Sequence, residues 1–184
     1  MAANQVDLFV GYCLRRYTQP ASLVLDVGCG PAPYRHWVSG HYVGLDVTDE
    51  PYGIDMPRSV DVVGSGMDLP LRAETFDLVF SKSAFFLIPD PLKALREIHR
   101  VLKPGGRVLL FDYNRRTQRQ LQAREQIARP CWTQWQLRSL VRQAGFRNCE
   151  LLVPKDRDVS GLEYWLRLVH QELFGIWAIV TGVK

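Results

Sequence analysis

The sequence predicts an α/β fold, with a mostly parallel sheet and helices on both faces. Apolar runs of strand length alternate with helical patterns as far as about residue 112, which is typical of βαβ units. The run 23–27 leads directly into Gly28-Cys29-Gly30, and the run 43–45 ends in Asp46. Because parallel strands end at a common edge, we expect the glycine turn and the acid to lie together there.

Length and composition limit the possibilities further. The chain has 184 residues, 47% hydrophobic and 23% charged, which is enough for one domain with a substantial core, and we expect residues 1–184 to form a single domain. The net charge of +4 is small, so a nucleic-acid partner is disfavoured. Four cysteines without Cys-x-x-Cys spacing predict neither a metal site nor a disulfide framework.

Membrane insertion is not predicted. No apolar run reaches the ~18–20 residues that a membrane span needs. The beginning of the sequence lacks a basic segment followed by an apolar one, so we expect a cytoplasmic protein.

The first half of the chain carries the clearest local patterns. Apolar side chains at helical spacing predict a helix over 3–18, which Pro20 ends. A strand over 22–28 is followed by a short helix from Pro31 to about residue 39, whose N-terminus would favour an anionic group. Strands are expected over 42–46 and 60–63, and the prolines and glycine of 48–59 predict a loop between them.

The second half continues the alternation. A loop over 64–71 precedes a strand over 76–80 and a helix over 91–102, which ends at Lys103-Pro104-Gly105-Gly106. The remaining expected elements are a strand over 107–112, a basic helical segment over 114–130, a helix over 133–144, a strand over 146–153, a helix over 159–172 and a strand over 176–183.

Four strand ends are therefore expected around one crevice. They contribute Gly28–Gly30, Asp46, the loop 65–68 and the segment 80–82. Glycines allow a ligand to approach the backbone, and a carboxylate about 20 residues later can accept hydrogen bonds from two ribose hydroxyls. This spacing predicts a nucleoside site.

Four sequence blocks in the same order resemble the class I S-adenosylmethionine-dependent methyltransferases, in particular the small-molecule branch known as type 11. The blocks are Val24-Leu25-Asp26-Val27-Gly28-Cys29-Gly30, Tyr42-Val43-Gly44-Leu45-Asp46, Phe76-Asp77-Leu78-Val79 and 95–106. The resemblance covers about 22–113. It implies a Rossmann-like, seven-stranded, mostly parallel sheet with a reversed last strand. It also divides the chain into an N-terminal helix (1–20), a cofactor-binding half (22–113) and a substrate-side half (114–184).

The resemblance implies S-adenosylmethionine as the cofactor. The residues expected to bind it are Asp26, Gly28, Cys29, Gly30, Asp46, Val47, Ser65, Gly66, Met67, Asp68, Ser81 and Lys82. Of these, Asp26 and the two glycines would line the methionine half, and Asp46 would hold the ribose diol. The family usually has an acid five residues before the proline at position 70, where it accepts a hydrogen bond from the adenine amino group. This chain has Ser65 at that position, with Asp68 as an acid nearby.

Other positions also depart from the family pattern. Ala32 replaces the third glycine of the turn, and Phe85-Phe86-Leu87 occupies the place of a common Leu-His-His. No general base is therefore assigned, and no metal is expected.

The resemblance implies methyl transfer to an oxygen, nitrogen or carbon nucleophile of a small molecule. The arginines of 115–129 are either a solvated face or a surface for an anionic acceptor. The absence of an Asp/Asn-Pro-Pro-Tyr block disfavours methylation of nucleobase or glutamine nitrogens, and the missing Gly-x-Gly-x-x-Gly spacing disfavours a nicotinamide oxidoreductase. The alternative function is a non-catalytic, cofactor-binding regulatory or scaffold subunit, and the oligomeric state is left open.

Overall fold

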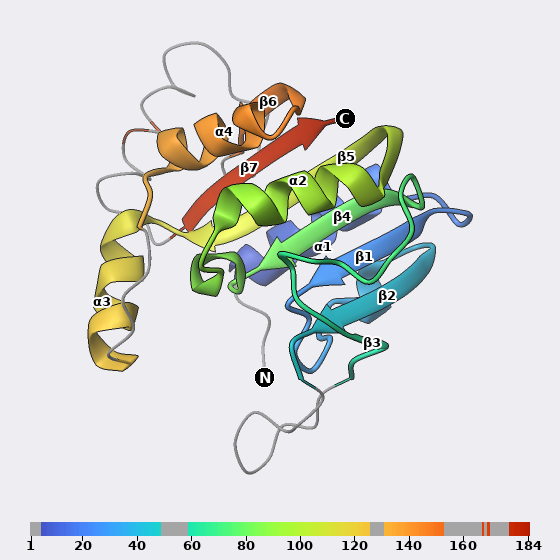
Figure 1. Cartoon of the computed structure of the whole chain (residues 1–184), viewed down its shortest axis with the longest axis horizontal. Coiled ribbons are helices and arrows are strands. Elements are labelled where there is room, and N and C mark those ends of the chain that lie inside the picture. Colours follow the sequence, from blue (N-terminus) through green and yellow to red (C-terminus); the bar gives the residue numbers. More distant parts are fainter. Residues whose placement is uncertain (1–4, 49–58, 126–130, 153–166, 168, 170–176) are drawn as a thin grey trace.

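The computed structural model describes residues 5–48, 59–125, 131–152, 167, 169 and 177–184 (Figure 1). Its elements, with η for a 3₁₀ helix, are α1 (Gln5–Tyr17), β1 (Leu23–Val27), η1 (Arg35–Trp37), β2 (His41–Asp46), β3 (Val62–Val63), β4 (Phe76–Lys82), η2 (Phe85–Leu87), α2 (Pro91–Val101), β5 (Leu102–Tyr113), α3 (Arg115–Glu125), α4 (Gln134–Gln143), β6 (Arg147–Leu151) and β7 (Trp177–Val183). The expected helix over 159–172, most of the loop over 48–59 and the end of the basic segment lie outside the described residues.

The seven described strands form one sheet in the order β3-β2-β1-β4-β5-β7-β6. The strands β1 to β5 pair in parallel, whereas β7 is antiparallel to both β5 and β6. The predicted fold class, including the reversed last strand, is therefore confirmed. Among the described residues, no helix is long and apolar enough to cross a membrane.

Helices cover both faces of the sheet (Figure 1). On one face, α2 and α4 pack through buried residues such as Leu95, Ile98 and Leu137. On the other face, Val10 and Leu14 of α1 pack against strand residues that include Phe80 and Phe111. The strands β1, β4 and β5 are consequently buried on both sides, as their nearly continuous apolar sequences require.

The expected helix from Pro31 to residue 39 is wrong in extent, because the structure has only the short 3₁₀ helix η1. Pro33 disfavours the helical conformation in the residue before it, and that residue, Ala32, adopts a positive φ of 51°. The predicted anion site at a helix N-terminus is therefore not formed. The strand β5 also begins earlier than expected, since Leu102 pairs with Phe76 before a shift in register.

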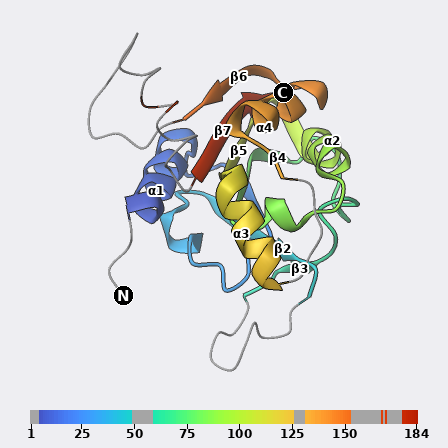
Figure 2. The same cartoon turned by 90° about the vertical axis from the view of Figure 1, so that its left-hand side faces the viewer.

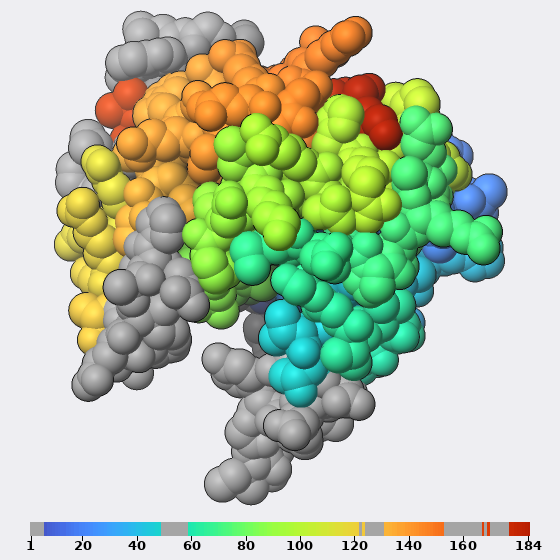
Figure 3. All heavy atoms as spheres, viewed as in Figure 1, coloured from blue at the N-terminus to red at the C-terminus, as the bar shows by residue number. Residues whose placement is uncertain are grey.

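The carboxyl ends of β1, β2 and β4 lie at one edge of the sheet, and α3 stands beside that edge (Figure 2). In the space-filling view the cyan end of β2 and the green residues that precede β4 are neighbours at the surface (Figure 3). The fold thus brings the predicted strand ends together.

Candidate functional site

The glycine turn after β1 is fastened to the end of β2. The N–H groups of Gly28 and Cys29 donate to the Leu45 carbonyl at 2.8 and 3.1 Å. The N–H of Gly30 donates to Asp46 Oδ2 at 2.9 Å. Gly28 and Gly30 have φ values of 78° and 52°, which glycine adopts without a steric penalty. The acid and the turn are therefore one hydrogen-bonded unit.

Asp26 is a buried acid beneath this turn, with an exposed fraction of 2%. Its Oδ2 accepts a hydrogen bond of 2.6 Å from the Tyr42 hydroxyl. Burial raises the pKa of Asp26 to about 7, although the bond from Tyr42 opposes the rise. A carboxyl group with this pKa changes its charge close to neutral pH.

A cavity of about 150 Å³ opens beside the turn. It is lined by Asp26, Gly28, Cys29, Gly30, Pro31, Pro33, Tyr34 and Lys82. Small-molecule sites usually measure ~300–1,000 Å³, so this cavity has room for one end of a nucleoside-sized ligand. It contains one acidic and one basic side chain, which suits the charged groups of an amino acid.

Five of the predicted cofactor residues line this cavity, namely Asp26, Gly28, Cys29, Gly30 and Lys82. The others lie around it in different ways. Asp46 is half-buried at the end of β2, and the side chain of Val47 is 67% exposed beside it. Ser81 is buried, and its hydroxyl donates to the Val27 carbonyl at 2.8 Å, which ties β4 to β1.

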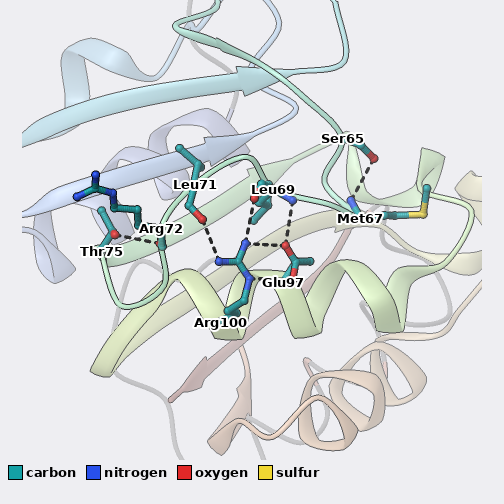
Figure 4. A network of polar contacts seen from close by, with 8 residues as sticks. All are labelled: Ser65, Met67, Leu69, Leu71, Arg72, Thr75, Glu97 and Arg100. Carbon is teal, nitrogen blue, oxygen red and sulfur yellow. Dashed lines mark hydrogen bonds and ion pairs between the residues drawn. The ribbon is translucent and has the colours of Figure 1, made fainter.

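The loop over 64–71 holds the remaining predicted residues. Ser65 Oγ accepts a hydrogen bond from Met67 N at 3.2 Å, so this hydroxyl shapes the loop locally (Figure 4). A Cβ atom on the buried Gly66 would lie 3.2 Å from Val27 Cγ1, so this position is tightly packed against β1. Asp68 is exposed. The loop therefore passes close to the end of β1.

Two side chains of α2 hold this loop in place (Figure 4). The Arg100 guanidinium donates to the carbonyls of Leu69 and Leu71, both at 2.9 Å. Glu97 Oε2 accepts a bond from Leu69 N at 3.0 Å and pairs with Arg100 at 2.7 Å. The hydrogen bond from Arg100 lowers the pKa of Glu97. Sequence reasoning missed this pair, although its spacing of three residues is a recognisable helical ion-pair pattern.

Tyr34 and Tyr42 were also missed as site residues. Tyr42 pairs in register with Val24, two residues before Asp26, which brings its ring within reach of that acid. Tyr34 lines the cavity and donates a 2.6 Å hydrogen bond to Asp7 of α1. The register of β2 would have indicated Tyr42, whereas the contact between Tyr34 and Asp7 depends on how α1 packs.

The candidate site has no cluster of metal-ligating side chains among the described residues. Among the described residues, no group of three or more His, Cys, Asp or Glu side chains is placed to hold a metal ion. The three buried cysteines are Cys13, Cys29 and Cys149, and burial raises the pKa of each thiol. They are consequently poor nucleophiles.

Comparisons with known proteins agree with this geometry. Residues 25–110 match the model of a family described as "Methyltransferase domain". A demethylmenaquinone methyltransferase of Staphylococcus epidermidis is 33% identical over 111 residues, covering 54% of this chain and 46% of that protein. A relative of the same name from Lysinibacillus sphaericus is 34% identical over 110 residues, covering 51% of this chain and 45% of that protein. The chain thus spans about half the length of the curated relatives it matches.

Solved structures share the fold. A methyltransferase of Thermotoga maritima, described as a possible histamine N-methyltransferase, has a TM-score of 0.65 at 19% identity, over 97% of this chain and 95% of that one. A putative methyltransferase in complex with the Haloferax volcanii Trm112 activator has a TM-score of 0.67 at 24% identity, over 95% and 88%. At these identities the likeness concerns the fold alone.

Proposed function

Since the chain belongs to the class I S-adenosylmethionine-dependent methyltransferases, we propose that it transfers a methyl group from S-adenosylmethionine to an oxygen, nitrogen or carbon nucleophile of a small molecule. We propose residues 1–184 as one domain for this reaction, acting in the cytoplasm. The observation that carries the proposal is the bond between Gly30 and Asp46, which sets a glycine turn and an acid side by side at the strand ends.

The residues present fit the cofactor. Gly30 leaves the turn open to a ligand, since even a Cβ at this position would meet nothing within 4 Å. In the proposed placement, the methionine tail occupies the cavity with its ammonium group beside Asp26. Asp46 would accept hydrogen bonds from the ribose hydroxyls, and Val47 and the loop over 65–68 would border the adenine.

The protein's contribution to the reaction is alignment. The bound cofactor would supply a methyl group on a positively charged sulfur. An electron pair of the acceptor would attack the methyl carbon in line, and the carbon–sulfur bond would break to leave neutral S-adenosylhomocysteine. The glycine turn and Asp46 would hold the cofactor, so that the methyl group faces the segment after β4. Fixing two reactants in this way can supply ~7–11 kcal/mol of the barrier reduction. A general base is needed only for acceptors that arrive protonated.

The class of acceptor is supported by the relatives. Those named demethylmenaquinone methyltransferases favour a small-molecule acceptor for this chain too. A regulatory or scaffold subunit that binds the cofactor without turnover is the alternative to be tested.

The test has two stages. Titration calorimetry with S-adenosylmethionine and with S-adenosylhomocysteine measures cofactor binding, with Asp46→Ala as the variant that should bind weakly. Transfer of a labelled methyl group from the cofactor to compounds of a metabolite extract then measures turnover. Binding with transfer supports an enzyme. Binding without transfer to any compound supports the scaffold alternative, and absence of binding refutes the proposed site.

A further inference from the structure

Lys82 lies where the cavity meets two other elements of the fold. It is the last residue of β4, and it lines the cavity beside the glycine turn. Its Nζ lies 4.9 Å from the centre of the Trp177 ring and 5.9 Å from that of Tyr34. The ammonium group is therefore placed between the cofactor side of the site and the start of β7.

The Trp177 ring is the first of three aromatic rings that contact one another in a row. We call these residues, Phe86, Tyr113 and Trp177, the aromatic wall. Trp177 stacks on Tyr113 with ring centres 4.7 Å apart and an interplanar angle of 25°. Tyr113 meets Phe86 edge-on at 5.3 Å and 80°. The rings come from η2, β5 and β7, and those of Tyr113 and Trp177 are partly exposed. Offset-stacked and edge-to-face arrangements are those that aromatic ligands also prefer.

The charge of Lys82 is only loosely compensated. Its side chain is 17% exposed, and among the described residues its ion-pair partner is Asp7, with Nζ and Oδ1 3.7 Å apart. The same Asp7 oxygen accepts the shorter bond of 2.6 Å from the Tyr34 hydroxyl. Burial lowers the pKa of Lys82, since a desolvated ammonium group is less stable than a hydrated one. A second anion beside Nζ would favour the charged form of Lys82.

We propose that Lys82 and the aromatic wall form the acceptor subsite, and that it takes a planar aromatic molecule carrying an anionic oxygen, either a carboxylate or an ionised hydroxyl. The ring of the acceptor would lie against Tyr113 and Trp177, with its oxygen on Lys82 Nζ. The inference rests on the proposed function, because the cavity on the other side of Lys82 is assigned to the methyl donor. Donor and acceptor would thus meet at the end of β4.

The test measures binding of simple probes to the full chain saturated with S-adenosylhomocysteine. The probes are 2-naphthoate and 4-nitrophenolate as aromatic anions, 2-naphthalenemethanol as a neutral aromatic, and cyclohexanecarboxylate as a non-aromatic anion. Dissociation constants come from ligand-observed NMR titrations. The wild-type protein should bind the aromatic anions about tenfold more tightly than 2-naphthalenemethanol, as expected for one hydrogen bond to a charged group. It should also bind them more tightly than cyclohexanecarboxylate, which has no aromatic ring to pack on the aromatic wall.

Variants then assign the preference to residues. Lys82→Met should remove the preference for aromatic anions over the neutral aromatic, whereas Lys82→Arg should keep it. Trp177→Leu should weaken all aromatic probes. The matched control is Lys93→Met, which removes one positive charge from an exposed position of α2 and should change no probe. An unchanged far-ultraviolet circular dichroism spectrum shows that a variant is folded.

The outcomes separate the two proposals. If the wild-type protein does not bind S-adenosylhomocysteine, the proposed function itself fails. If it binds the cofactor product but no aromatic probe, or binds charged and neutral probes equally, the acceptor subsite is refuted while the function stands. A Lys82→Met variant that loses affinity for S-adenosylhomocysteine and keeps its probe preference would place the ammonium group on the methionine carboxylate, and would also overturn the inference.

Discussion

The N–H of Gly30 and the carboxylate of Asp46 are joined by a hydrogen bond of 2.9 Å, although they belong to different strand ends. Asp46 Oδ1 also accepts a bond of 2.8 Å from Val47 N. The carboxylate thus shapes the glycine turn. Changes at Asp46 should consequently act on the turn as well as on the ribose.

Asp46→Ala should weaken the binding of S-adenosylhomocysteine by about 2–4 kcal/mol, because two charge-assisted hydrogen bonds to the ribose are lost and water compensates in part. Titration calorimetry measures the change. Asp46→Asn is the matched control, since its amide oxygen can still accept from Gly30 and its loss should be smaller. An unchanged dissociation constant for Asp46→Ala would refute the placement of the ribose.

The two glycines of the turn should differ in their tolerance of alanine. A Cβ on Gly28 would lie 2.3 Å from Ala84 Cβ, whereas one on Gly30 has open space, so only its positive φ is unfavourable. Gly30→Ala should lower the free energy of unfolding by about 1–2 kcal/mol, and Gly28→Ala by more. Denaturant titrations measure both values.

The double variant Gly28→Ala/Ala84→Gly provides the control for this comparison. Removing the methyl group of Ala84 relieves the clash, so the double variant should lose less stability than the sum of its two single variants. Simple additivity of the two single effects would contradict the predicted contact.

Ser65 should limit affinity on the adenine side of the site. An aspartate there could keep the turn bond from Met67 N and offer a charged oxygen to the adenine amino group. We expect Ser65→Asp to bind S-adenosylhomocysteine about tenfold more tightly, the gain of roughly one charge-assisted bond. Affinity of this variant for S-inosylhomocysteine, the analogue of S-adenosylhomocysteine that lacks the amino group, should not rise. Equal gains for both ligands would argue against this contact.

Asp112 should make stability fall as pH rises. It is fully buried at the end of β5, and burial raises its pKa to about 8. Hydrogen bonds from the backbone N–H groups of Tyr113 and Phe86 act in the opposite direction, because they favour the charged carboxylate. The folded state therefore holds a proton that the unfolded state releases near pH 4. This contribution to stability is complete below about pH 4 and is lost progressively as the pH rises through 8.

Asp112→Asn removes the titrating group while keeping an oxygen acceptor. The free energy of unfolding of this variant should vary less between pH 5 and 8.5 than that of the wild-type protein. Asp26, with a pKa of about 7, leaves a residual dependence in the same direction. Glu150→Gln, at an exposed position of β6, should follow the wild-type curve. Parallel curves for Asp112→Asn and the wild-type protein would contradict the prediction.

Local patterns predicted most of the described elements and several of the residues that line the cavity. The run into Gly28-Cys29-Gly30 predicted β1 and its turn, because buried strands and glycine turns have strong local signatures. The same reasoning failed at 31–39, where Pro33 and the positive φ of Ala32 leave only η1. The conformation of this segment depends on its backbone dihedral angles, which the spacing of apolar side chains does not predict.

The sequence by itself determined the order of strands and helices, the glycine turn and the acid at the end of β2. Only the tertiary structure decided which side chains meet, such as Tyr42 on Asp26 and Asp7 of α1 beside Lys82. These partners come from different elements, and strand register and helix packing bring them together. Register and packing minimise the free energy of the whole core, so a short stretch of sequence encodes its own backbone preference but not its distant neighbours.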